Sequence, residues 1–426
     1  MLKDIKFLIT FLIAFILLFS FNSISLQARP LLFAPEEKVE IYCAWNDDFN
    51  CLAKSKLYEL LKNKYPNVEI INAHIACTNK DDINDLLIKR IFEGNPPDIF
   101  QVHCSHELIN NLVKTGSVSS ITNLLNEMDI IKKFNPQILR MYSYEGEVYA
   151  LPITIHRGNV VFYNKNLLKQ HNITPPQNIY SLLASMHKLR EKGITPLAVG
   201  NYNNQGLLHI FENILLDTVG IYSYQDFCSG NITLDGLSIM TTLQLFQKTT
   251  FYMNDNYNEI NWKKAVEMVS NGEAAYTFVG DWALTYFKKL GTVPGKDIGW
   301  IFTGSPTHFM VVSEGFSLPK EANNLAMAEQ WIKTIATKEV QESICKITGS
   351  ISTRMDVLAV VNDPYLNDQG NDLVNNMHLY FPSMAYGAAA SEELVYLLNQ
   401  ILANYLVDGK TRRAQNELIT VINDNL

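Results

Sequence analysis

The sequence predicts an α/β protein made of two lobes. Three observations support this: strand and helix patterns alternate early in the chain, two long strand-like runs each contain a break, and 426 residues exceed what one hydrophobic core usually serves. The apolar fraction of 47% is ordinary for a globular protein. We therefore expect two α/β lobes that the chain crosses between.

The amino terminus has the order of a secretory signal. Lys3 and Lys6 precede an apolar run at 7–21, and small and polar residues follow through Ala28. The run is shorter than the roughly 20 residues of a membrane-spanning helix. We expect residues 1–28 to be a cleaved signal peptide and the mature chain to be periplasmic. A retained membrane anchor is the alternative.

The segment after the signal alternates between strand and helix patterns. We expect strands at 38–45, 68–73 and 98–102, with helices at 51–64 and 82–93 between them. Gly94 and the Asn95-Pro96-Pro97 sequence end the second helix. This order predicts a mainly parallel sheet that is flanked by helices.

The run VYALPITIHRGNVVFYN at 148–164 is strand-like, but His156, Arg157, Gly158 and Asn159 interrupt its apolar pattern. We interpret it as a crossing between lobes, with the polar residues at a cleft.

Beyond this run the chain is more helical, and a second strand-like run follows at 309–318, FMVVSEGFSL, with Gly315 at its break. Two crossings imply discontinuous lobes. The helices expected here lie at 179–192, 207–218, 237–249, 261–271 and 322–348, and the short strands at 274–279 and 299–302.

Composition and motifs argue against several functions. The net charge of -8 and the lack of a dense basic block argue against a nucleic-acid ligand. Six cysteines, at 43, 51, 77, 104, 228 and 345, form no CxxC pair, and any disulfide pairing among them stays open. Motifs of serine hydrolases, zinc proteases and nucleotide-binding loops are absent. We expect no catalytic activity, metal or cofactor. A glycosidase that uses Asp281 as one of two carboxylates is the alternative.

Seven segments, in order, are informative together: GNPPDIFQ at 94–101, EGEVYALPITIHRGNVVFYN at 145–164, GDWALTYFKKLGTVPGKD at 280–297, FSLPK at 316–320, ATKEVQ at 336–341, GSISTRMD at 349–356 and PSMAYG at 382–387. They resemble segments of the extracellular solute-binding proteins of bacterial ABC importers that carry sugars. The first three look like the glucose- and mannose-binding branch.

This resemblance implies a type II periplasmic-binding-protein fold, similar to maltose-binding protein, with a hinge and an interlobe cleft. Lobe 1 would comprise 36–150 and 314–369, and lobe 2 would comprise 151–313 and 370–426. The protein would be a monomer that carries glucose, mannose or a disaccharide to the membrane subunits of an ABC permease.

Sugar binding needs aromatic faces and planar polar groups, which indicates the candidate ligand residues. Trp45 aligns with a cleft tryptophan of the family, and Asp281 aligns with a carboxylate that accepts hydrogen bonds from sugar hydroxyls. Packing in the core is the alternative for Trp45, and helix capping is the alternative for Asp281. Trp282, next to Asp281, is expected to pack in the interior.

The resemblance also indicates three polar candidates. His156 and Arg157 match a His-Arg pair beside the hinge, and Gln101 ends a strand of lobe 1. A structural salt bridge is the alternative for Arg157, and an ordinary loop role is the alternative for Gln101.

The chain departs from the glucose branch at positions that would contact the ligand. The departures are Asn50 in place of an acidic residue, Asn204 in place of a tryptophan before Gln205, Thr348 in place of a lysine, and Tyr386 in place of a histidine. Tyr202 and Tyr386 can supply aromatic contacts, or they can be wall residues that do not touch the ligand. The ligand is therefore expected to differ from glucose, for example as a disaccharide. A non-sugar ligand or a sensor role is the alternative.

Overall fold

The structure is a computed structural model that describes residues 38–45, 48–73, 83–202, 204–230, 236–357, 363–375 and 378–425. The expected signal at 1–28, the first two residues of the expected lobe 1 and Cys77 lie outside the described residues. Within the described ranges, no helix is both long enough and apolar enough to cross a membrane.

The described chain alternates strands with helices, as the sequence predicts. The strands are β1 (Lys38–Tyr42), β2 (Glu69–Asn72), β3 (Ile99–His103), β4 (Ser143–Tyr144), β5 (Glu147–Val148), β6 (Ala150–Arg157), β7 (Val160–Asn164), β8 (Thr195–Leu197), β9 (Ala274–Phe278), β10 (Ile298–Phe302), β11 (His308–Ser317) and β12 (Leu379–Pro382). The helices are α2 (Asp48–Lys64), α3 (Ile83–Phe92), α4 (His106–Leu108), η1 (Ile109–Val113), α5 (Thr122–Glu127), η2 (Ile131–Lys133), α6 (Pro136–Arg140), α7 (Lys165–Gln170), α8 (Ile179–Arg190), α9 (Gly206–Cys228), α10 (Gly236–Thr250), α11 (Trp262–Ser270), α12 (Ala283–Lys289), α13 (Leu325–Ile335), α14 (Lys338–Thr348), α15 (Pro364–Val374), α16 (Glu392–Asp408) and α17 (Thr411–Asn425).

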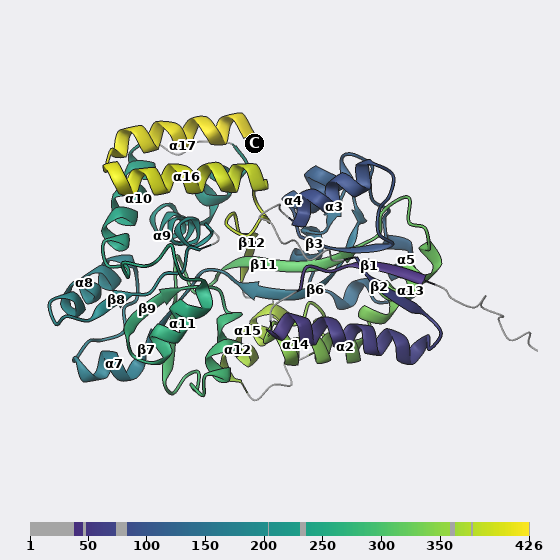
Figure 1. The fold of residues 1–426 in the computed structure, drawn as a ribbon, viewed down its shortest axis with the longest axis horizontal. Coiled ribbons are helices and arrows are strands. Elements are labelled where there is room, and N and C mark those ends of the chain that lie inside the picture. Colours follow the sequence, from purple (N-terminus) through teal and green to yellow (C-terminus); the bar gives the residue numbers. More distant parts are fainter. Residues whose placement is uncertain are drawn as a thin grey trace, which may run out of the picture. The chain divides into compact units, whose positions relative to one another are not determined.

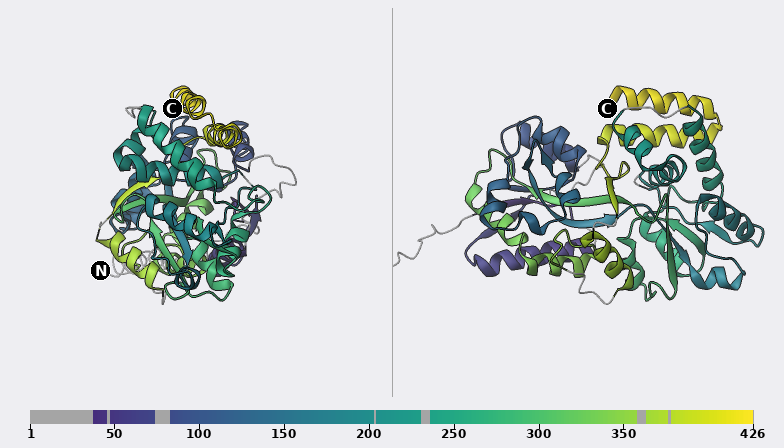
Figure 2. Two further views of the ribbon diagram at one scale, coloured as in Figure 1. Left: turned by 90° about the vertical axis from the view of Figure 1, so that its left-hand side faces the viewer. Right: turned by 180° about the vertical axis from the view of Figure 1, so that it is seen from behind.

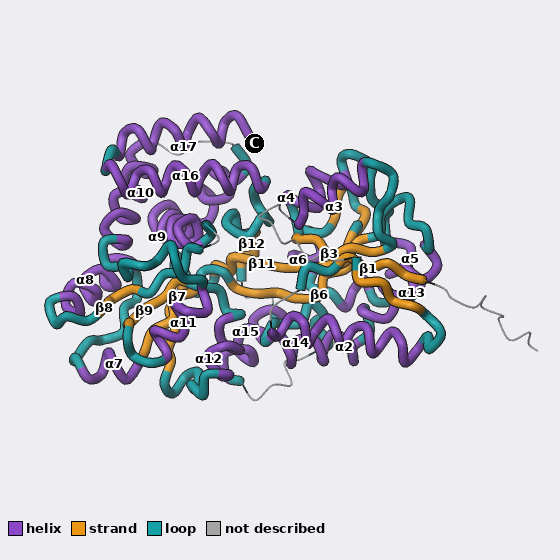
Figure 3. Tube along the Cα trace, viewed as in Figure 1, coloured by secondary structure: helices purple, strands orange, loops and turns teal. Residues whose placement is uncertain are grey.

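These elements build one main sheet in each lobe, which confirms the predicted two-lobe α/β fold (Figure 1, Figure 3), and β4 and β5 form a separate two-stranded sheet. In lobe 1 the strand order is β12-β11-β3-β1-β2, and β6 also pairs with β11. In lobe 2 the order is β10-β7-β9-β8. The βα units put β1, β2 and β3 in parallel, but β11 runs antiparallel to both β3 and β6. The predicted mainly parallel sheet is confirmed in lobe 1, where three of the five strand pairings are parallel. In the lobe 2 sheet only β8 and β9 pair in parallel.

The polar break in the 148–164 run is where the chain passes from one sheet to the other. β6 belongs to the lobe 1 sheet and β7 belongs to the lobe 2 sheet. Between them, the Gly158 N–H donates to the Met310 carbonyl on β11, at 2.8 Å. β11 makes the second crossing because it follows β10 of lobe 2 and enters the lobe 1 sheet. The interpretation of both runs as crossings is correct.

A third crossing follows β12. This strand pairs with β11 in lobe 1, whereas the helices after it, α16 and α17, pack on α9 and α10 of lobe 2. Figures 1 and 2 show this helix pair beside α10 from both sides of the molecule. The carboxy-terminal segment therefore returns to lobe 2.

Two helix predictions need correction. The helix expected at 322–348 is two helices, and the Thr337 side chain caps the second by accepting from the Val340 N–H, at 3.4 Å. The helix expected at 207–218 continues to Cys228, across Gly220, whose φ of 77° breaks the helical path.

The five cysteines in the described part of the chain, at 43, 51, 104, 228 and 345, are free thiols.

Candidate functional site

A pocket of about 730 Å³, counting space open to solvent, lies where the two lobes and the crossing strands meet. From lobe 1, two helices and the end of β3 contribute Phe49, Asn50, Thr348 and His103. Lobe 2, with the segment that connects it to β12, contributes Trp262, Trp282 and Tyr386. The crossing strands contribute His156, Val312 and Glu314. Aromatic faces thus alternate with hydrogen-bonding groups around one pocket.

A second cavity of about 550 Å³, counted in the same way, adjoins this pocket and shares Trp262, Trp282 and Tyr386 with it. Its other lining residues all come from lobe 2 and include Gln205, His209 and Thr277. We call it the inner chamber. It extends the interlobe pocket into lobe 2.

His156 presents its imidazole to the pocket from the end of β6. Its Nδ1 lies 2.8 Å from Asp281 Oδ1, and Tyr365 donates its hydroxyl to the other oxygen of Asp281, at 3.0 Å. The Asp281 side chain is fully buried and does not line the pocket. Because a carboxylate only accepts, this arrangement places the proton of the bond on Nδ1. Asp281 therefore orients His156.

His103 presents a second imidazole from the opposite lobe. Its Nδ1 lies 2.7 Å from Glu107 Oε2, and its backbone N–H donates to Glu107 Oε1, at 3.2 Å. Burial disfavours the charged ring, but the Glu107 carboxylate, with help from Glu314, outweighs burial and raises the pKa of His103 to about 9. The pocket therefore contains an imidazolium at neutral pH.

Glu314 brings a carboxylate into the pocket from β11. Its Oε2 accepts from Trp45 Nε1, at 2.8 Å, and from Thr154 Oγ1, at 3.3 Å. The antiparallel register sets Glu314 opposite His103 on β3. The acidic and basic groups thus stand side by side on the same sheet.

The aromatic wall is formed by lobe 2. The rings of Trp282 and Tyr386 meet edge to face, with centroids 4.8 Å apart, and His209 contacts the Tyr386 ring at 5.2 Å. Burial raises the pKa of Tyr386, so its hydroxyl stays protonated. Trp282 packs against the hydrophobic core, as expected, and it also lines both cavities.

The predicted ligand residues separate into three groups by their positions. Asn50, His156, Thr348 and Tyr386 line the pocket, and Gln205 lines the inner chamber. Trp45, Gln101 and Asp281 are buried behind the pocket. Tyr202, 68% exposed, and Asn204, with a φ of 57°, line neither cavity.

The buried residues behind the pocket support its walls. The Trp45 side chain is only 2% exposed; it packs edge to face on Phe316 and holds Glu314. Gln101 Oε1 accepts from the Ala44 N–H, at 2.9 Å, and from the Cys43 thiol, at 3.2 Å. Direct contact of Trp45 or Gln101 with a ligand stays a prediction.

Arg157 is fully buried at the first crossing. Its guanidinium donates to the side-chain oxygens of Asn159 and Gln369 and to the carbonyls of Pro306 and His308, at 2.6 to 3.1 Å. Phe302 lies under it, 3.5 Å from the ring centroid. No carboxylate among the described residues pairs with it, so Arg157 braces the crossing through neutral acceptors rather than through the salt bridge considered above.

Sequence reasoning missed His103, Glu314, Trp262 and Phe49 as pocket residues. Glu314 could have been found from the sequence, because it is a lone acidic residue inside the apolar run at 309–318. Across the described part of the chain, no group of three metal-ligating side chains is assembled.

Comparison with known proteins agrees with this architecture. Residues 78–342 match the family model of the bacterial extracellular solute-binding proteins. An uncharacterized extracellular-binding protein of an ABC transporter from Pyrococcus horikoshii is 31% identical over 392 residues, covering 92% of this chain and 88% of the relative. A probable sugar-binding periplasmic protein of Rhizobium meliloti is 26% identical, with 90% of each chain covered. The glucose-binding protein GlcS of Saccharolobus solfataricus is 22% identical, covering 69% of this chain and 57% of that protein.

Solved structures share the fold at lower identity. The solute receptor AcbH, described as preferring β-D-galactopyranose, superposes with a TM-score of 0.76 at 15% identity, covering 92% of this chain and 98% of AcbH. RafE in complex with raffinose gives a TM-score of 0.73, also at 15% identity, covering 91% and 99%. The matching family is non-catalytic. The chain belongs to the bacterial extracellular solute-binding protein family.

Proposed function

We propose that this protein is the periplasmic sugar receptor of an ABC importer, which captures a mono- or disaccharide between its lobes and delivers it to the membrane permease. The observation that carries this proposal is the composition of the interlobe pocket. Aromatic faces from Phe49, Trp262 and Trp282 surround the hydrogen-bonding groups of Glu314 and His156. Apolar ring faces and dense hydroxyls are the two features of a sugar that such a pocket recognises.

The lining also bears on which sugar is bound. The charge of His103 is paired with Glu107, and Glu314 adds a carboxylate to the pocket, which favours a neutral ligand over a sugar acid or a sugar phosphate. The inner chamber adds space and polar groups next to the aromatic wall, which favours a disaccharide over a single ring. A relative named for glucose binding, a receptor described as preferring β-D-galactopyranose and a receptor solved with raffinose agree with a sugar ligand.

The test is a thermal-shift and calorimetric screen of protein that lacks residues 1–28. The panel contains D-glucose, D-mannose, D-galactose, maltose and cellobiose, with amino acids and glycerol phosphate as controls. A ligand at a hundred times its dissociation constant should stabilise the fold by about 2.7 kcal/mol. Stabilisation by an amino acid or by glycerol phosphate, with none by any sugar, would contradict the proposal.

A further inference from the structure

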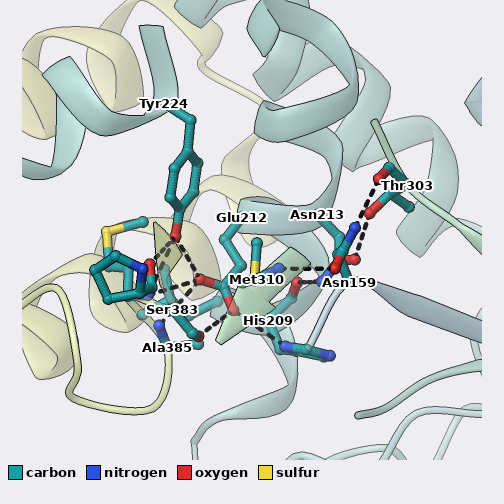
Figure 4. Close-up of polar contacts among 12 residues, drawn as sticks. Asn159, His209, Glu212, Asn213, Tyr224, Thr303, Met310, Ser383 and Ala385 are labelled. Carbon is teal, nitrogen blue, oxygen red and sulfur yellow. Dashed lines mark hydrogen bonds and ion pairs between the residues drawn. The ribbon is translucent and has the colours of Figure 1, made fainter. Parts of the chain in front are cut away.

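A fully buried carboxylate, Glu212 on α9, binds the turn that follows β12 (Figure 4). Ser383 Oγ donates to Glu212 Oε1, at 2.8 Å, and the N–H groups of Met384 and Ala385 donate to Oε2, at 2.9 and 3.2 Å. The Tyr224 hydroxyl donates to the same oxygen, at 3.1 Å. The Glu212 carboxylate therefore holds the PSMAYG segment in place.

The chemistry of this contact explains its geometry. Successive backbone N–H groups of a turn form a concavity that binds anions, and a carboxylate can accept about four hydrogen bonds. A buried charge is costly unless such bonds satisfy it. Glu212 is satisfied only while the turn keeps its present conformation, so the carboxylate and the turn fix each other.

The turn leads directly into Tyr386, a wall residue of both cavities. Glu212 also lies 3.1 Å from His209 Nδ1, and the His209 ring contacts the Tyr386 ring. The second ring nitrogen of His209, Nε2, points away from the Glu212 carboxylate (Figure 4). One carboxylate thus holds both the backbone before Tyr386 and a side chain packed against it.

The next residue, Asn213, reaches the other two crossings. Thr303 Oγ1 donates to Asn213 Oδ1, at 2.7 Å, and the Thr303 carbonyl accepts from Asn159, at 2.9 Å. Asn159 Oδ1 in turn accepts from the Met310 N–H on β11, at 3.0 Å. Adjacent residues of α9 therefore anchor the chain where each crossing described above meets lobe 2.

We propose that Glu212 is a positioning residue for ligand recognition: by holding the 383–385 turn against α9, it sets Tyr386 in the sugar-binding wall. This inference rests on the proposed function. If the turn adopts its binding-competent form only part of the time, the apparent affinity falls in proportion to the populated fraction.

Hydrogen exchange tests the clamp without a ligand. In Glu212→Gln, which keeps the shape but replaces one acceptor oxygen with a donor, the amides of Met384 and Ala385 should exchange at least about tenfold faster. The matched control is Asp98→Asn. Asp98 is also a buried carboxylate, 4% exposed, and accepts from the Glu40 and Asn324 N–H groups of lobe 1, far along the chain from the turn. Unchanged exchange at Met384 and Ala385 in Glu212→Gln would overturn the clamp.

Calorimetric titration with D-glucose and with maltose tests the consequence for binding. Losing a buried hydrogen bond costs about 1–3 kcal/mol, so Glu212→Gln should weaken binding of the sugar that wild type takes by about 5- to 150-fold. Asp98→Asn should stay within about twofold. In a Tyr386→Ala background, the effect of Glu212→Gln should largely vanish, because the positioned group is gone.

The outcomes separate the two proposals. Equal weakening by Glu212→Gln and Asp98→Asn, or full additivity with Tyr386→Ala, overturns the positioning role. If wild type binds neither sugar, the proposed function fails for these ligands, and the exchange experiment still decides whether Glu212 fixes the turn.

Discussion

Replacing Asp281 with asparagine should weaken sugar binding, although Asp281 does not line the pocket. The two carboxylate oxygens have separate partners: Oδ1 meets His156 Nδ1, at 2.8 Å, and Oδ2 accepts from the Tyr365 hydroxyl, at 3.0 Å. An asparagine side chain has one acceptor oxygen and one NH₂ group, so it cannot accept at both ends. One of the two bonds must be lost or reversed.

The magnitude follows from the burial of the group. The Asp281 side chain is fully buried, so water cannot replace the missing partner. An unsatisfied buried donor costs about 1–3 kcal/mol, and stability should fall by about that amount. If the loss falls on His156, its ring is no longer held toward the pocket. Sugar affinity should then drop by about 5- to 150-fold, because 1.4 kcal/mol corresponds to a factor of ten.

The assay is calorimetric titration with the sugar that the screen identifies, combined with urea unfolding to measure stability. Tyr365→Phe is the matched control, since it removes only the bond to Oδ2 and leaves His156 held. It should lower the free energy of unfolding but keep affinity within about twofold. The reasoning is refuted if Asp281→Asn binds as tightly as wild type, or if both variants weaken binding equally.

Two further predictions follow from the walls of the pocket. Trp45→Ala should lower the free energy of unfolding by about 3–5 kcal/mol, because it empties a core site, and it should also weaken sugar binding by releasing Glu314. Urea unfolding measures the first effect and calorimetric titration measures the second. Loss of stability without loss of affinity would limit Trp45 to packing. The pKa of His103 is raised to about 9 from an ordinary 6.5, so its ion pair with Glu107 should stabilise the fold fully below pH 6.5 and lose that effect as pH rises to 9. The His103 side chain is 30% exposed, so screening by solvent limits the change to about 1–2 kcal/mol. The free energy of unfolding should depend less on pH across this range in His103→Gln than in wild type. An identical pH profile in the two proteins would contradict the stabilising ion pair of His103 with Glu107.

The sequence predicts the elements of this fold better than their pairing. Apolar periodicity and stop signals such as the Asn95-Pro96-Pro97 sequence locate helices and strands within a few residues, because these signals are local. Strand direction is not local. The antiparallel pairing of β11 with β3 and β6 joins segments more than 150 residues apart, so the pattern that suggested a parallel sheet could not reveal it.

The site divides in a similar way. Asn50, Thr348 and Tyr386 could be found because they occupy recognisable positions in ordered motifs. Glu314 and His103 become neighbours only through the register of β11 on β3. The buried position of Trp45 depends on its bond to Glu314, a residue 269 positions away. Neither fact can be deduced from residue type and local spacing.

The pocket combines fixed and replaceable parts. Each polar group that a strand presents to the pocket is held by a second group: Asp281 holds His156, Glu107 holds His103, and Trp45 holds Glu314. Glu107 and Trp45 come from the same lobe as the groups they hold, so closure of the lobes would not need to reorganise these two contacts, and a preorganised group loses less free energy on binding.

Apart from Asn204, which lines neither cavity, the departures from the glucose branch line the pocket itself. Asn50 and Thr348 line it from lobe 1 and Tyr386 lines it from lobe 2. A lining residue can change without leaving a buried hydrogen-bonding group unsatisfied, whereas changing Asp281, Glu107 or Glu212 would leave donors without their acceptor. Substitution of the lining residues can therefore change the choice of ligand while the supporting groups keep the architecture of the pocket.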